Sequence, residues 1–91
     1  MERRERIEGK LRERLAAEHV EVVDESHLHA GHAGAAAGGG HFRTLVVSER
    51  FAGLGPVQAQ RLVYEALDDE MGGEIHALSI RTLTPDRWSG S

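Results

Sequence analysis

The spacing of apolar residues changes along the chain, and each change predicts a different element. In residues 2–17, Ile7, Leu11 and Leu15 recur at every fourth position among Arg, Glu and Lys. This period predicts an amphipathic helix whose charged side is solvated. Residues 19–25, HVEVVDE, alternate instead, which predicts a short strand.

Two later stretches also alternate. Residues 41–48, HFRTLVVS, and residues 75–82, IHALSIRT, each place apolar residues at every second position. In the second stretch Leu78 and Ile80 mark the apolar face. Strand parity predicts that His76 lies on that same face.

A second helix is predicted between these two strands. It begins at Pro56, since proline suits the first helical position, and runs to about Met71, where Gly72 and Gly73 end it. Its apolar stripe contains Val63, Leu67 and Met71. The run Asp68, Asp69 and Glu70 is predicted to be a solvated acidic patch at the end of this helix.

Two short segments are expected to close the ends of the sheet. Residues 49–55, ERFAGLG, predict a tight turn with Phe51 and Leu54 tucked under the sheet. Residues 84–88, TPDRW, predict a single helical turn that begins after an N-capping Thr. We expect the ring of Trp88 to lie over the sheet or the first helix.

These elements predict an α+β fold of one domain, residues 1–91, in the order αββαβα. The strands at 19–25 and 41–48 are expected to pair antiparallel, and the crossover helix allows the strands at 41–48 and 75–82 to pair in parallel. The result is a three-stranded mixed sheet with both main helices on one face and a short tail at 89–91.

A glycine-rich loop separates the first two strands. Residues 27–40, HLHAGHAGAAAGGG, have no apolar period and are predicted to be flexible. Two interpretations stay open: a low-complexity insertion, or a mobile arm carrying imidazole ligands for a metal. His29 and His32 lie within this loop, and His41 directly follows it.

Composition and charge exclude several classes of protein. The chain has 91 residues, 40% of them apolar, no cysteine and a net charge of −4. Disulfides and any thiolate site made by this chain alone are excluded, and the acidic balance disfavours nucleic-acid binding. No apolar run approaches the roughly 20 residues of a membrane span, and the charged start is unlike a signal peptide, so a cytoplasmic protein is expected. No nucleophile or phosphate-binding motif occurs, which predicts a protein that is not an enzyme.

Five motifs in order resemble the BolA family from about Ile7 to Trp88. They are DES with a following His at 24–29, HFRTLVVSERFAGL at 41–54, QRLVYEAL at 60–67, EIHALSIRT at 74–82 and TPDRW at 84–88. The resemblance implies the BolA fold, which is similar to class II KH domains. The chain departs from the family where Ala59-Gln60-Arg61 stands in place of the frequent RHR.

The resemblance also implies a function. BolA-like proteins partner monothiol glutaredoxins and share a 2Fe–2S cluster with them in iron–sulfur trafficking or iron regulation. The His of the final-strand motif, a cluster ligand in the family, falls on His76. The loop ligand falls on His29, with His32 and His41 as alternates. Glutaredoxin and glutathione would supply the thiolates, so the isolated chain is expected to be a monomer without a cluster.

The alternative function is that of a KH-like, nucleic-acid-binding transcriptional regulator. Arg50, Arg61 and Arg81, with Arg87, are the candidate residues for such binding. The GXXG loop by which KH domains grip a nucleic-acid backbone is absent from the expected position.

Overall fold

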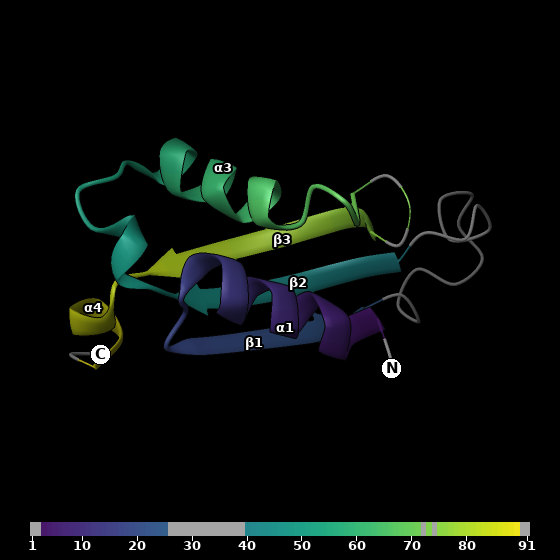
Figure 1. Ribbon diagram of the computed structural model, residues 1–91, viewed down its shortest axis with the longest axis horizontal. Coiled ribbons are helices and arrows are strands. Elements are labelled where there is room, and N and C mark those ends of the chain that lie inside the picture. The colour runs from purple at the N-terminus through teal and green to yellow at the C-terminus, as the bar shows by residue number, and fades with distance from the viewer. Residues whose placement is uncertain (1–2, 26–39, 72, 74, 90–91) are drawn as a thin grey trace.

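The computed structural model describes residues 3–25, 40–71, 73 and 75–89 (Figure 1). The elements follow the predicted order, with one additional 3₁₀ turn. They are α1 (Arg3–Leu15), β1 (His19–Asp24), β2 (Gly40–Val47), the 3₁₀ turn η2 (Glu49–Phe51), α3 (Pro56–Ala66), β3 (Ile75–Leu83) and α4 (Pro85–Ser89).

The three strands form one mixed sheet in the order β1-β2-β3. β1 and β2 pair antiparallel, with Val22 opposite Thr44, and β2 and β3 pair in parallel, with Phe42 opposite Leu78. Both pairings confirm the prediction. Because β2 and β3 are parallel, both strands begin at the same end of the sheet.

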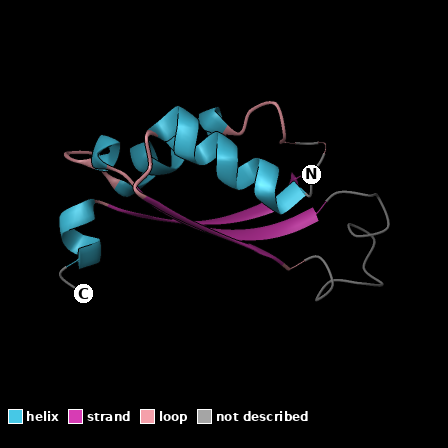
Figure 2. Cartoon of the chain, turned by 60° about the horizontal axis from the view of Figure 1, so that its bottom comes forward, coloured by secondary structure: helices cyan, strands magenta, loops and turns pink. Residues whose placement is uncertain are grey.

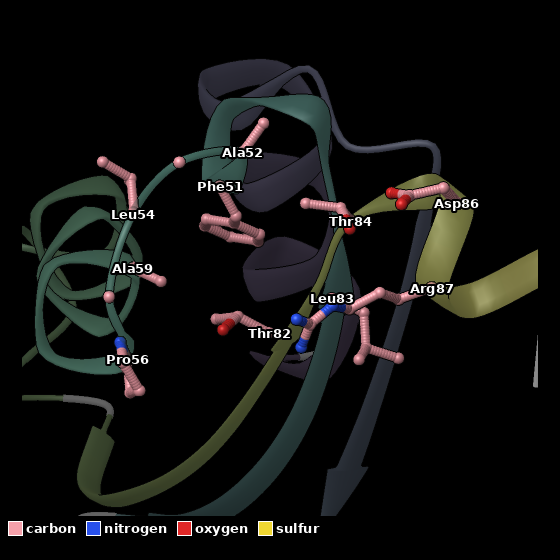
Figure 3. A pocket seen from close by; sticks show the side chains of 12 residues that line it. Phe51, Ala52, Leu54, Pro56, Ala59, Thr82, Leu83, Thr84, Asp86 and Arg87 are labelled. Atoms are coloured by element: carbon pink, nitrogen blue, oxygen red, sulfur yellow. The ribbon is translucent and has the colours of Figure 1, made fainter.

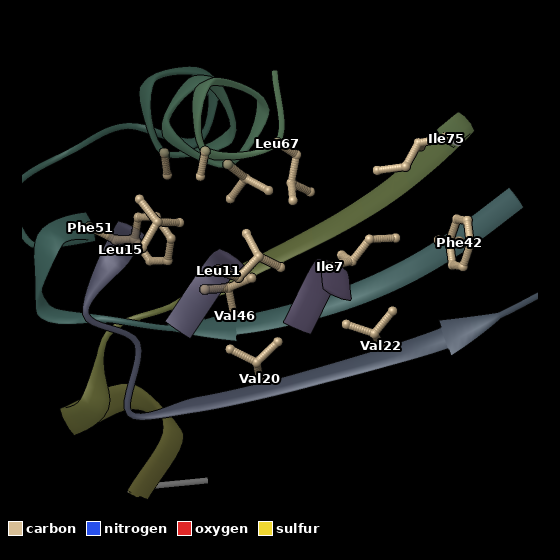
Figure 4. Close-up of a cluster of buried hydrophobic side chains, with 13 residues drawn as sticks. Ile7, Leu11, Leu15, Val20, Val22, Phe42, Val46, Phe51, Leu67 and Ile75 are labelled. Carbon is tan, nitrogen blue, oxygen red and sulfur yellow. The ribbon is translucent and has the colours of Figure 1, made fainter. Parts of the chain in front are cut away.

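Both main helices cover one face of the sheet, as predicted (Figure 2). The apolar stripe of α1 and the apolar side of α3 meet the inward residues of all three strands (Figure 4). Phe42, Ile7, Leu11, Leu67 and Ile75 are among the largest fully buried side chains. Because successive residues of a strand point to opposite faces, the residues between the buried ones face the uncovered side of the sheet.

A buried hydroxyl joins the end of α1 to the end of β2. Ser48 is fully buried, and its Oγ donates to the carbonyl oxygen of Leu15 at 2.7 Å. The next residue, Ala16, has a left-handed backbone with φ 48°, which ends the helix. The chain then turns directly into β1.

The second helix ends earlier than predicted, at Ala66 rather than near Met71. The side chain of Arg14 donates to the carbonyl oxygen of Ala66 at 2.7 Å, so an α1 residue satisfies the helix end. Leu67 and Glu70 are both buried in the turn that follows. Tertiary contacts with α1 therefore decide this boundary, and the two glycines lie beyond it.

The predicted solvated acidic patch is wrong for Glu70, which is buried, whereas Asp69 is exposed as predicted but ion-paired. Glu70 Oε1 lies 2.7 Å from Arg6 Nε and 2.9 Å from Lys10 Nζ. Asp69 bonds to Lys10 and Arg14, whose H-bond donors lie 2.7 Å and 2.9 Å away. Basic residues of α1 thus neutralise the carboxylates at the end of α3, and only Asp68 is left as an exposed residue without a described ion pair.

The two closing segments follow the predictions in part. Phe51 is buried as expected, whereas Leu54 is 37% exposed. The ring of Trp88 stacks on that of His19 in β1, with centroids 4.5 Å apart, so it lies against the sheet rather than α1. None of the helices in the described ranges has the length and apolar character needed to cross a bilayer.

Candidate functional site

The candidate site lies at the end of the sheet where strands β2 and β3 begin (Figure 1). His41 is the second residue of β2, and His76 is the second residue of β3. Since these strands are parallel neighbours, their first residues lie side by side. The ring centroids of His41 and His76 are 5.3 Å apart and their planes are tilted by 49°.

A β-bulge determines the direction of His76. Gly40 is opposite Ile75, but His41 is opposite Ala77, so His76 is an extra residue in β3. The bulge shifts parity by one position. Ile75 is therefore fully buried and His76 is exposed. The prediction that His76 shares the apolar face of Leu78 and Ile80 is wrong for this reason.

The two imidazoles differ in their exposure. His41 is half-buried, and its Nε2 atom is shielded from solvent, whereas His76 is open to solvent. Neutral imidazole is a good ligand for iron, zinc and copper, and N–metal distances are about 2.0–2.1 Å for zinc. The 5.3 Å separation of the ring centroids is compatible with both rings bonding one metal centre of this kind.

Close packing beneath the pair fixes the start of β2. Gly40 is buried, and a Cβ atom built on it would lie 2.5 Å from Cε2 of Phe42. The guanidinium of Arg3 lies over the ring of Phe42, with Cζ 5.6 Å from the ring centroid. Only glycine fits at this position without moving the Phe42 ring. The close contact between Gly40 and this ring therefore fixes the backbone next to His41.

The end of β1 holds His41 from the other side. The backbone N–H of Glu25 donates to the carbonyl oxygen of His41 at 2.7 Å. The carboxylate of Glu25 also pairs with Arg43 of β2 at 3.2 Å. The segment between β1 and β2 therefore begins after Glu25, which is hydrogen-bonded to His41, and ends at Gly40, the residue before His41.

His29 and His32 lie in that loop, outside the described residues, and so do all residues of the predicted flexible segment 27–40 except Gly40. Gly40, which was expected to end the loop, is already the first residue of β2. Among the described residues no group of three or more His, Cys, Asp or Glu is arranged to hold a metal. Within the described ranges, His41 and His76 alone would not complete the ligand set of a metal.

The candidate arginines do not form one patch in the described structure. Arg50 lies in η2, Arg61 on α3 and Arg81 in β3, and all three are exposed. Arg81 follows the core-packed Ile80 and so faces the uncovered side of the sheet, whereas α3 covers the opposite side. Arg61 and Arg81 are therefore separated by the sheet.

Sequence reasoning did not single out the pairing of His41 with His76. The signal was present, because each histidine lies at the start of a strand and the two strands were predicted to be parallel neighbours. The bulge that turns His76 outward gave no such signal. It depends on Ile75 entering the core cluster that also contains Leu67, and both of these side chains are fully buried.

Comparison with known proteins identifies the family. A family model described as BolA-like protein matches residues 11–87. BolA-like protein 1 of Mus musculus is 46% identical over 82 residues, which cover 90% of this chain and 58% of the mouse protein. The chain therefore spans less than two thirds of that relative.

A bacterial relative and a solved structure belong to the same family. The DNA-binding transcriptional regulator BolA of Escherichia coli is 40% identical over 87 residues, covering 96% of this chain and 80% of the regulator. The BolA domain of SufE1 from Arabidopsis thaliana has a TM-score of 0.81 and 39% identity, with 96% of each chain covered. The chain belongs to the BolA-like protein family.

Proposed function

We propose that this chain is a non-enzymatic partner of a monothiol glutaredoxin and shares a 2Fe–2S cluster with it. The complex would be a heterodimer that serves iron–sulfur cluster trafficking or iron regulation in the cytoplasm, and the chain alone would be a monomer. The single observation that carries the proposal is the His41–His76 pair at one edge of the sheet.

The donor set suits a shared cluster. This chain has no cysteine, so it contributes imidazole alone, and the thiolates would come from the glutaredoxin and glutathione. Exposed His76 is the first ligand in this proposal, and the second is His29, with His32 and His41 as alternates. The cluster would supply electron-transfer and cluster-donor chemistry when it is bound.

The residues of this chain tune that site in two ways. A ligating imidazole must be neutral, so the affinity should weaken as the pH falls through the imidazole range. Half-buried His41, held by Glu25 and by the packing at Gly40, offers a rigid position beside His76. His76 offers an accessible one. A rigid and an accessible ligand together favour a cluster that can be passed on.

The experiment is co-expression with a monothiol glutaredoxin, followed by visible absorption and circular dichroism of the purified complex. We expect a cluster spectrum that changes when this chain is present. His76→Ala should abolish the change, His29→Ala should weaken it, and the double variant with His32→Ala should weaken it further. His41→Ala tests the alternate directly.

His19→Ala is the matched control. His19 lies at the far end of β1, where its ring stacks on Trp88 and its Nε2 bonds to Glu21 at 2.7 Å. This variant should leave the cluster spectrum unchanged. An unchanged spectrum for His76→Ala, or no complex with the glutaredoxin, would overturn the proposal.

A second candidate function is supported by the printed name of the Escherichia coli relative, a DNA-binding transcriptional regulator. The charge of −4 and the separation of Arg61 from Arg81 weigh against it. Fluorescence anisotropy with duplex DNA at physiological salt is the test. Binding that survives this salt and weakens in an Arg50→Gln, Arg61→Gln or Arg81→Gln variant would favour regulation.

A further inference from the structure

A pocket of about 630 Å³ lies at the end of the sheet opposite to the histidine pair (Figure 3). It is formed between the segment that joins η2 to α3 and the segment that joins β3 to α4. Its size is within the usual range of small-molecule sites. The histidine site uses none of the residues that line it.

The pocket has one apolar wall and one polar wall. Phe51, Leu54 and Ala59 contribute the apolar side, and Thr82, Thr84 and Arg87 contribute the polar side. Figure 3 shows the Arg87 side chain extending past Leu83 toward Thr82, with its guanidinium facing the hollow. An apolar wall with a single cation at its rim suits a ligand that has an apolar body and one negative charge.

The charges around the pocket select the sign of that ligand. Among the described residues, Arg87 makes no ion pair and no side-chain hydrogen bond. The carboxylate of Asp86 is held by the Thr84 hydroxyl and by backbone N–H groups, and these bonds together with the nearby charge of Arg87 lower its pKa. α3 begins at Pro56, which has no N–H to offer an anion. Arg87 is thus the positively charged side chain of the lining that is available to an anion.

We infer that this pocket binds a carboxylate attached to an apolar group, with the carboxylate paired to Arg87 and the apolar group packed against Phe51 and Leu54. Guanidinium and carboxylate form a planar, bidentate pair, which fixes the orientation of the ligand. The fixed charge of Asp86 beside Arg87 disfavours a dianion such as a phosphate monoester. One cation also supplies too little charge for a nucleic-acid backbone.

Two sources share this chemistry: the C-terminus of a peptide that ends in an apolar residue, and a free organic acid. N-acetylglycyl-phenylalanine and 3-phenylpropanoate represent them as probes, and the primary amide of each is its neutral counterpart. The ¹⁵N-labelled full chain would be titrated with each compound while backbone amide signals and the Arg87 Nε–H signal are followed.

We expect the acids to shift signals in residues 51–55 and 82–87, and the amides to bind at least about tenfold more weakly, as loss of a charge-assisted hydrogen bond predicts. Arg87→Gln should weaken the acids by a similar factor, and Arg87→Lys should weaken them less. Arg50→Gln, which removes an exposed arginine outside the lining, should have no effect. Tighter binding of the acetylated dipeptide would identify a peptide C-terminus, and tighter binding of phenylpropanoate a free acid.

Three results would overturn the inference: equal binding of acid and amide, unchanged binding in Arg87→Gln, or shifts that lie outside the pocket. The spectrum of Arg87→Gln without ligand shows whether its fold is intact. If it is not, Leu54→Ser gives the second test, because this exposed residue lines the apolar wall and its loss should weaken both acids. These results are independent of the cluster spectrum with glutaredoxin.

Discussion

Glu70 and Arg6 form an ion pair, with Glu70 Oε1 2.7 Å from Arg6 Nε, although Glu70 follows α3 and Arg6 lies near the start of α1. The Glu70 side chain is only 7% exposed, and Lys10 approaches the same oxygen at 2.9 Å. This carboxylate therefore links the two helices on the outer side of the core.

Replacing Glu70 with alanine should lower the free energy of unfolding by about 1–3 kcal/mol, because Arg6 and Lys10 would lose their shared anionic partner and the packing of the buried side chain would be lost. Chemical denaturation measures the change. The control is Asp68→Ala, which removes a neighbouring exposed carboxylate and should alter the free energy by less than about 0.5 kcal/mol. Equal effects of the two variants would contradict the role of the Glu70 link.

Acid should destabilise the chain through Asp69. Hydrogen bonds from Arg14 first and Lys10 second hold the pKa of Asp69 well below its ordinary value. Because the folded pKa is the lower one, the stabilisation is present above the unfolded pKa of about 3.9 and is lost as the pH falls through the folded value.

We therefore expect the thermal midpoint to decrease as the pH is lowered from about 5 toward 2, and Asp69→Asn to reduce the slope of this decrease. Asp68→Asn is the matched control and should leave the slope unchanged. If both variants follow the slope of the parent chain, the bonds from Arg14 and Lys10 do not persist in solution.

Gly40→Ala should destabilise the fold and disturb the histidine pair. The new Cβ would lie 2.5 Å from the Phe42 ring, which is itself 2% exposed and has no room to retreat. We expect a loss of about 1–3 kcal/mol, with shifted side-chain signals for His41.

Gly9→Ala should have the opposite effect on stability. Nothing lies within 4 Å of a Cβ at this position in α1, so alanine should raise stability by about 0.4–1 kcal/mol through its helix propensity. A Gly40→Ala variant as stable as Gly9→Ala would mean that the contact with Phe42 is not maintained.

Adjacent residues of the bulge should respond very differently to truncation. Ile75 is fully buried and His76 is exposed, so Ile75→Ala should cost about 2–5 kcal/mol and His76→Ala less than about 1 kcal/mol. Denaturation of the two variants without any partner measures this difference. A large loss in His76→Ala would assign that ring to the core and remove the premise for its role as a ligand.

The helices and strands were predictable because their apolar residues repeat with local periods. The stripe of Ile7, Leu11 and Leu15 and the alternation through Phe42 are set by backbone geometry alone. The antiparallel and parallel pairings followed from the lengths of the connections. Boundaries were less certain, and α3 ends before Met71 because Arg14 and the buried Leu67 decide where the helix stops.

The family, the order of the elements and the candidate histidines could all be predicted from the sequence. Three features emerge only in the folded chain: Ile75 and not His76 enters the core, His41 lies beside His76, and basic residues of α1 neutralise Asp69 and Glu70. The physical reason is the range of the interactions. Periodicity records which face of an element is apolar, whereas a bulge, an ion pair or a ring contact depends on which distant residue fills the space opposite.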